Sequence, residues 1–324
     1  MPELRYYQAL NQALQEEFAR DERVFMMGED VGLAGGTFRV SEGLMAEFGS
    51  RRVRDTPIAE AGIVGIAIGA AMAGLRPIAE LMTMNFAIVA MDQIVNHVSK
   101  IRYMFGGQAA LPLVIRAPGG GWTQKAAQHS HAIESWFVNT PGLRVVIPST
   151  PYDAKGLLKT AIRSDDPVLF IEHEILYSTR GEVPEEEYLL PLGVADVKRP
   201  GRDVTIVAWS KMALEALKAA ERLANEGIEA EVVDPRTLDP LDFDTIVSSV
   251  LRTRRVVIAE EGWRNVGVGA ELAARLQENL FYDLDAPVQR VAAADTPTPY
   301  AKKLERLAIP RAERITEAVL KITL

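Results

Sequence analysis

The sequence predicts an α/β protein with two parallel-sheet domains. Its 324 residues exceed the usual size of a single domain. In both halves, short apolar or β-branched runs alternate with helical patterns, which is typical of parallel sheets covered by helices. An acidic, proline-bearing stretch separates the two alternations. We therefore expect domains at residues 1–185 and 201–324, joined by a linker at residues 186–200.

The first half carries six runs with strand character and three with helical character. The expected strands are Val24–Met27, Arg52–Pro57, Pro77–Met82, Leu113–Arg116, Arg144–Ile147 and Val168–Ile171. The expected helices are Glu60–Gly74, Ala87–Met104 and Tyr152–Arg163.

The second half repeats this alternation. The expected strands are Val204–Ala208, Glu229–Val233, Val256–Ala259 and Val288–Ala292. The expected helices run from after Ala208 to Asn225, around Phe243–Leu251, and from about Val268 to Asn279.

Composition excludes several classes of function. The net charge of −8 argues against nucleic acid or an anionic membrane as the main partner. The absence of cysteine excludes disulfides, thiolate zinc sites and cysteine nucleophiles. The first residues resemble neither a signal nor a transit peptide, and the longest apolar stretch, Ala61–Leu75, is too short to span a bilayer. We expect a soluble, cytoplasmic, bacterial-type protein.

Two carboxylates follow strands. Glu60 opens a helix rich in glycine and alanine after the strand at Arg52–Pro57, and Glu29 follows the strand at Val24–Met27. Open α/β sheets build ligand sites at the carboxyl ends of their strands, so the two acids could converge and relay a proton. The alternative is that Glu60 is only a first-turn acid stabilised by the helix dipole.

Other candidate side chains lie in two loops. Met82 and Phe86 offer soft and aromatic surface at a third strand end, although core packing is the ordinary role of such residues. His129 and His131 follow the flexible stretch Pro118–Gly121. A loop histidine is either a solvated residue or a proton carrier.

The order of several motifs resembles the beta subunits of the thiamine-diphosphate-dependent 2-oxo acid dehydrogenases. The resemblance covers essentially the whole chain. It rests on GEDVG, DTPIAEAGIVGIAIGAAMAGLRPIAELMTMNF, AMDQIVNHVSKIRYMFGGQ, AAQHS, TPYDAKGLLKTAIRSDDPV, GVGAEL and DTPTPYAK. It implies a transketolase-like pyrimidine-binding domain followed by a transketolase C-terminal domain. The segment MTMNF is similar to that of the pyruvate members, while acetoin and branched-chain enzymes remain alternatives.

The resemblance assigns roles to residues of the first domain. Glu60 matches the glutamate that binds the aminopyrimidine ring and favours its imino form, which then removes the thiazolium proton. Phe86 matches the residue that stacks on the pyrimidine, with Met82 and Ile58 nearby. Glu29 matches a buried acid linked to Glu60.

The resemblance also implies two less direct assignments. His129 matches an active-site histidine that assists proton transfer and acyl transfer to lipoamide. A potassium site, formed largely by backbone carbonyls, maps onto Leu113, Ala161, Ile162, Ser164 and Asp166. Many relatives carry aspartate at the position of Ser164, and the stretch Trp122–Lys125 also departs from relatives.

The sequence contains no Gly-Asp-Gly segment, with which thiamine enzymes normally bind diphosphate and magnesium. In the family that this chain resembles, an alpha subunit holds both. The expected assembly is a heterotetramer of two alpha and two beta chains, and the expected reaction is decarboxylation of pyruvate with reductive acetylation of lipoyl groups on an acyltransferase core.

Three other interpretations were weighed. Gly267-Val268-Gly269 hints at a nicotinamide-binding loop, but it does not follow a strand directly and lacks the third glycine. A non-catalytic binding subunit would not need Glu60, Phe86 and His129 together. A metal site at His129 and His131 lacks an adjacent third ligand.

Overall fold

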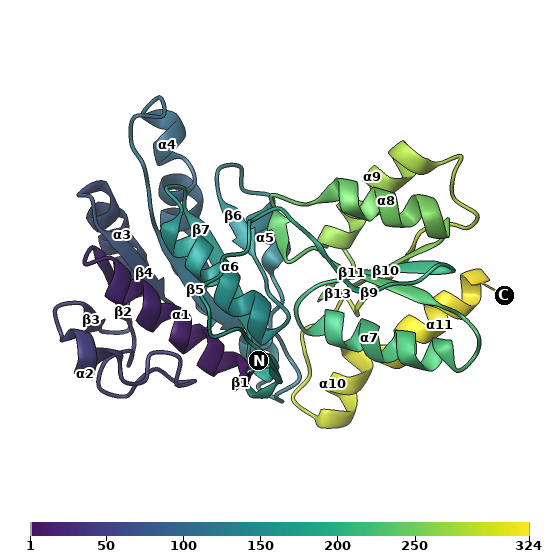
Figure 1. Cartoon of the computed structure of the whole chain (residues 1–324), viewed down its shortest axis with the longest axis horizontal. Coiled ribbons are helices and arrows are strands. Elements are labelled where there is room, and N and C mark those ends of the chain that lie inside the picture. Colours follow the sequence, from purple (N-terminus) through teal and green to yellow (C-terminus); the bar gives the residue numbers. More distant parts are fainter. Residues whose placement is uncertain (1, 324) are drawn as a thin grey trace. The chain divides into compact units, whose positions relative to one another are not determined.

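The computed structural model describes residues 2–323. The chain forms two compact units. One contains residues up to Gly119 together with Trp136–Leu192, and the other contains Gly120–Ser135 together with the residues from Gly193 onward. Both units are built from strands and helices in alternation, which confirms the predicted α/β class (Figure 1).

The first unit contains a parallel sheet. Its strands lie in the order β6 (Arg144–Val146), β7 (Val168–His173), β5 (Val114–Gly119), β4 (Arg76–Glu80), β2 (Val24–Gly28) and β3 (Val53–Asp55). Every neighbouring pair in that order is parallel, so the carboxyl ends of the strands share one edge. Separately, β1 (Glu3–Arg5) and β8 (Arg180–Glu182) form an antiparallel pair.

Helices cover this sheet because each has an apolar side. The helices α1 (Tyr6–Arg20) and α6 (Pro151–Arg163) pack against each other over the strands (Figure 1). The helix α3 (Glu60–Met72) packs on β4 and buries Ile63, Val64, Ala67, Ile68 and Ala71. Shorter elements are α2 (Leu44–Phe48), α4 (Ile101–Met104), η1 (Met84–Ile88), η2 (Gln93–Val98) and η4 (Glu174–Ser178). The helix α5 (Glu134–Val138) begins in the second unit and ends in the first.

The second unit contains a mixed sheet. Its strands lie in the order β14 (Gln289–Ala293), β13 (Val256–Trp263), β10 (Val204–Ala208), β11 (Ala230–Asp234) and β9 (Asp196–Arg199). All neighbouring pairs are parallel except β9 with β11, which is antiparallel. This edge strand lies inside the stretch 186–200 that we expected to be a linker.

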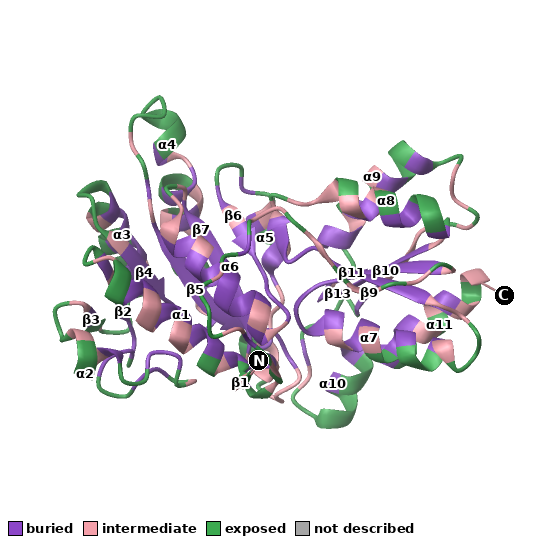
Figure 2. Cartoon of the chain, in the orientation of Figure 1, coloured by how far each residue is buried: buried purple, intermediate pink, exposed green. Residues whose placement is uncertain are grey.

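Helices cover both faces of the second sheet. Figure 1 shows α7 (Ser210–Ala224) and α11 (Ala312–Thr323) on one side, and α8 (Phe243–Thr253) and α9 (Val268–Leu280) on the other. The unit also contains η3 (Ala127–His129), β12 (Thr237–Asp239) and α10 (Lys302–Ala308). The strands β10 and β11 are buried along their length (Figure 2), as expected for strands covered on both faces.

One predicted helix is wrong. The stretch Ala87–Met104 was expected to be a single α-helix, but it divides into the end of the 3₁₀ helix η1, the π-helical η2 and the short α4. The hydroxyl of Ser99 donates to the carbonyl of Val95 at 2.7 Å. This kind of bond to the preceding turn bends helices, and the β-branched residues of the stretch also favour helices weakly.

Among the described residues 2–323, no helix combines the length and the apolar character needed to cross a membrane.

Candidate active site

Two acidic side chains lie at the carboxyl edge of the first sheet. Glu29 directly follows β2, and Glu60 is the first residue of α3, which follows β3 after a short loop. In the sheet, Gly28 pairs with Asp55 of β3 on one side and with Glu80 of β4 on the other. The loops that carry both glutamates therefore leave the sheet from adjacent parallel strands.

The acidic loop after β2 is held by the neighbouring strand. The carboxylate of Asp55 accepts hydrogen bonds from the backbone N–H of Gly32 at 2.6 Å and of Leu33 at 3.3 Å. A Cβ atom on Gly28 would lie 2.6 Å from the carbonyl oxygen of Glu80. Glycine at this position thus allows the chain to pass close to β4 just before Glu29.

The two glutamates influence each other electrostatically. Glu29 and Glu60 are both 5% exposed. Burial raises the pKa of the Glu29 carboxyl, and the negative charges of Glu60 and Asp30 raise it further. The buried Oε1 atom of Glu29 has no hydrogen-bond partner among residues 2–323. A buried carboxyl group whose pKa is raised by a neighbouring acid is a candidate for proton transfer.

The apolar candidates lie in two places: Met82 and Phe86 follow β4, and Ile58 precedes α3. Phe86 lies in η1, where its backbone N–H donates to the carbonyl of Thr83 at 3.0 Å. Phe86 and Met82 are half-buried, whereas Ile58 is 80% exposed. Since β4 is the neighbour of β2, these residues belong to the same sheet edge as Glu29.

A buried ionic network behind this edge was not predicted from the sequence. Arg116 of β5 is 1% exposed and lies between carboxylates of the two adjacent strands. It donates to Glu172 of β7 from Nε at 2.7 Å and also pairs with Glu80 of β4. The hydroxyl of Tyr177 donates to Glu172 as well. The signal in the sequence was a charged residue within or at the end of three largely apolar runs, at Glu80, Arg116 and Glu172.

The two candidate histidines belong to the second unit. His129 is the last residue of η3 and is exposed. His131 is half-buried, and its ring lies 5.7 Å from the ring of Trp263. Burial lowers the pKa of His131. Residues two apart in this loop therefore have different surroundings.

The residues expected to hold potassium are Leu113, Ala161, Ile162, Ser164 and Asp166. Arg76 donates from Nη1 to the carbonyl oxygens of Ile162 and Ser164, at 3.0 Å each. The carboxylate of Asp166 pairs with Arg102. A guanidinium beside these carbonyls repels a second cation, which disfavours potassium binding there. The potassium site stays a prediction, and no chemistry is assigned to it.

Within residues 2–323, no cluster of three or more His, Cys, Asp or Glu side chains is arranged to hold a metal ion.

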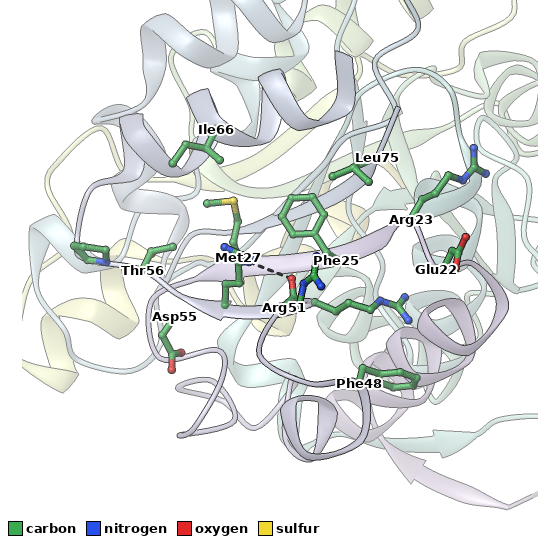
Figure 3. A pocket seen from close by; sticks show the side chains of 13 residues that line it. Glu22, Arg23, Phe25, Met27, Phe48, Arg51, Asp55, Thr56, Ile66 and Leu75 are labelled. Carbon is green, nitrogen blue, oxygen red and sulfur yellow. Dashed lines mark hydrogen bonds between the residues drawn. The ribbon is translucent and has the colours of Figure 1, made fainter. Parts of the chain in front are cut away.

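A cavity of about 810 Å³ opens beside the edge strand β3. Figure 3 shows Phe25 and Met27 from β2 and Ile66 from α3 at this cavity, which Arg23 and Arg51 also line. Glu29 and Glu60 do not line it, although the stretch Asp55–Pro57 does. The candidate acids therefore lie outside this cavity.

Comparison with known families gives two matches. The model described as "Transketolase, pyrimidine binding domain" matches residues 3–179. The model described as "Transketolase, C-terminal domain" matches residues 193–315. The resemblance inferred from the motifs is thereby confirmed at the level of the two domains.

Similar proteins extend this result over nearly the whole chain. A protein of Rickettsia felis named "Pyruvate dehydrogenase E1 component subunit beta" is 49% identical over 315 residues, which is 97% of each chain. The mitochondrial protein of that name from Drosophila melanogaster is 49% identical and covers 97% of this chain and 87% of its own. A "2-oxoisovalerate dehydrogenase subunit beta" from Bacillus subtilis is 45% identical over 99% of both.

A solved structure is similar as well. A chain described as "Split gene transketolase, inactive beta4 tetramer" superposes with a TM-score of 0.82 and 27% sequence identity, covering 98% of both chains.

Proposed function

This chain belongs to the beta-subunit family of the 2-oxo acid dehydrogenase E1 components, and we propose that it supplies the pyrimidine half of the active site of a pyruvate dehydrogenase. The observation that carries the proposal is the buried pair of Glu29 and Glu60 at the ends of adjacent parallel strands. The pyrimidine-binding domain match covers both residues. Thiamine diphosphate, when bound, supplies the reactive thiazolium carbon that attacks the 2-oxo group.

The residues present fit an aminopyrimidine ring. Glu60 would bind a ring nitrogen through its carboxyl group, and Glu29 would hold a proton that it can share with Glu60. The buried Oε1 atom of Glu29, which has no hydrogen-bond partner among the described residues, supports this role. Buried polar atoms are usually hydrogen-bonded, so such an atom is available to a bound ligand or to a shared proton. Phe86 would stack on the ring, while Met82 and Ile58 would exclude water beside it.

His129 would carry a proton in the later transfer of the acyl group to lipoamide. Its exposure and its place at the end of a 3₁₀ turn leave the imidazole accessible to a large acceptor. An imidazole side chain can act as a general acid or base in such a transfer.

The rest of the site would come from an alpha subunit. The chain contains no Gly-Asp-Gly segment for diphosphate and magnesium. The similar solved structure is named as an inactive assembly of beta chains, which supports the idea that such a chain needs its partner. We expect a heterotetramer of two alpha and two beta chains that acetylates a lipoylated acyltransferase core.

We propose pyruvate as the substrate for two reasons. Relatives named for pyruvate share 49% of their residues with the chain, and the MTMNF segment resembles theirs. The branched-chain relative is 45% identical, so 2-oxoisovalerate is the second candidate. The cytoplasmic location stays a prediction, because the Drosophila relative is described as mitochondrial.

The test is reconstitution with an alpha subunit of the same family. The purified assembly is assayed for acyl transfer to a lipoylated domain with pyruvate, 2-oxoisovalerate and acetoin. We expect kcat/KM for pyruvate to exceed the others at least about tenfold, which corresponds to about 1.4 kcal/mol of transition-state binding. A preference for 2-oxoisovalerate or acetoin would correct the substrate.

The isolated chain provides the second arm of the test. It should show no decarboxylation and only weak binding of thiamine diphosphate, because it holds the pyrimidine half alone. Tight, magnesium-dependent binding of thiamine diphosphate to this chain in calorimetry would contradict the shared site.

A further inference from the structure

The loop that carries His129 has an unusual backbone. Trp122, Gln124 and Ala126 all have positive φ angles, of 76°, 56° and 64°. Non-glycine residues rarely adopt this left-handed region. Three such residues at every second position of one loop keep this conformation only when surrounding contacts stabilise it. The next turn, η3, begins directly afterwards, and the backbone N–H of His129 donates to the carbonyl of Ala126 at 3.4 Å. The conformation at residues 122–126 therefore sets the position of His129.

The contacts that stabilise this loop conformation come from residues much later in the sequence. Glu261 of β13 accepts two hydrogen bonds, one from the backbone N–H of Gly121 at 2.6 Å and one from Nε1 of Trp122 at 2.9 Å. Glu261 is 8% exposed. Two donors on one buried carboxylate form a strong, directional attachment.

The indole ring of Trp122 is held as well. The ammonium of Lys211 lies 4.3 Å from the ring centroid, and the guanidinium of Arg311 lies 4.0 Å from it. Both distances are within the range of cation–π attraction. Further along the loop, Glu305 of α10 accepts from the backbone N–H of Gln124 at 3.0 Å.

We propose that Glu261 is a positioning residue, which fixes Gly121 and Trp122 and thereby places His129 for acyl transfer. Glu261 belongs to a strand more than a hundred residues further along the chain, and it acts through the loop. The proposal rests on the proposed role of His129, because only then does loop placement affect catalysis. It goes beyond that role by naming the side chain that makes the strained loop conformation stable.

The decisive variant is Glu261→Gln. Glutamine has one oxygen, so it can accept from only one of the two donors, and its NH₂ group would face the other. In the reconstituted heterotetramer, amide hydrogen exchange of the peptide covering Gly121–His129 should become about tenfold faster or more. Acyl transfer to the lipoylated domain should fall about 10- to 100-fold, because small displacements of a catalytic group have effects of this size. Hydrogen–deuterium exchange at the thiazolium carbon should stay unchanged, since it depends on Glu60.

Two further variants complete the design. Trp122→Phe removes the indole N–H but keeps an aromatic ring, and if both residues act in one contact, the double variant should lose less than the product of the single losses. It also keeps the proposal testable if Glu261→Gln does not assemble. Glu278→Gln is the matched control, because Glu278 is an exposed glutamate on α9 of the same unit.

The results separate the two proposals. If the unchanged assembly fails to acetylate the lipoylated domain, the proposed function fails, while the exchange measurement still tests the attachment of the loop. If Glu261→Gln and Trp122→Phe both leave loop exchange and acyl transfer at the level of Glu278→Gln, Glu261 is no positioning residue.

Discussion

Trp209 donates its indole N–H to Glu134 at 3.1 Å, and both side chains are buried in the second unit. Burial raises the pKa of the Glu134 carboxyl to about 7, although the hydrogen bond from Trp209 opposes this, and the nearby charges of Glu260 and Glu261 add to it. Near neutral pH, the folded chain therefore holds a proton on Glu134 that the unfolded chain releases.

The first prediction concerns the pH dependence of stability. Between the ordinary pKa of 4.5 and the raised pKa of about 7, folded Glu134 is protonated and unfolded Glu134 is not, so the free energy of unfolding falls as pH rises. The loss amounts to about 3 kcal/mol across this window. Glu134→Gln keeps an oxygen for Trp209 but cannot ionise. It should match the unchanged protein near pH 4.5 and exceed its stability at pH 8.

Urea unfolding at the two pH values measures this effect. Tryptophan fluorescence reports mainly on the second unit, because Trp122, Trp209 and Trp263 belong to it and only Trp136 to the first. A stability difference between Glu134→Gln and the unchanged protein that is the same at both pH values would contradict the raised pKa.

A second prediction tests whether Glu60 takes part in proton transfer or only stabilises the start of α3. Glu60→Gln in the assembled enzyme should slow hydrogen–deuterium exchange at the thiazolium carbon about 100- to 10,000-fold, because the amide cannot deliver a proton. Glu47→Gln is the matched control, since Glu47 is also a first-turn acid but is exposed on α2. If both variants exchange at the normal rate, Glu60 only stabilises the start of α3.

A third prediction concerns the turn at Gly142. Gly142 has φ +96°, and a Cβ atom there would lie 2.1 Å from the carbonyl oxygen of Ser99, just after η2. Gly74 has φ +92° with no atom within 4 Å of a Cβ. Gly74→Ala should therefore cost about 1 to 2 kcal/mol of unfolding free energy from backbone strain alone. Gly142→Ala should cost roughly 1 to 3 kcal/mol more from the clash.

Denaturant unfolding followed by circular dichroism compares these two alanine variants directly. Since both have nearly the same φ, the difference between them isolates the contact with Ser99. Equal stabilities for the two variants would mean that the carbonyl of Ser99 moves aside at little cost.

The sequence predicted the parts of the structure that depend on local patterns. The strand at Val204–Ala208 was predicted with its observed bounds, and Glu29 and Glu60 were expected at one sheet edge because adjacent parallel strands end together. Such reasoning uses only periodicity and strand direction.

Contacts between distant segments could not be predicted in this way. Glu134 and Trp209 are 75 residues apart, and Glu134 has the sequence signature of an ordinary surface acid. The segment Gly120–Ser135 groups with the second unit because its partners, among them Glu261 and Glu305, come more than a hundred residues later. Local sequence patterns do not indicate these contacts, because they depend on how distant segments pack in the folded chain.

The last prediction separates the two histidines. His129 is exposed, whereas His131 is half-buried beside Trp263 and has a pKa lowered by burial. An imidazole that resists protonation in an enclosed place is a poorer proton donor to a bulky acceptor than an exposed one. His129→Ala should therefore severely reduce acyl transfer to a lipoylated domain, while assays with an artificial oxidant lose less. His131→Gln should be mild in both assays, because glutamine still forms hydrogen bonds.

The measurement is a parallel kinetic comparison of the two variants in the reconstituted heterotetramer. The artificial-oxidant assay is the internal control, because it needs decarboxylation but no acyl transfer to lipoamide. A large loss in that assay for His129→Ala would place His129 in the earlier steps instead. Near-normal acetylation by His129→Ala together with a large loss in His131→Gln would show that the half-buried imidazole carries the proton, and that exposure is the wrong criterion for choosing between them.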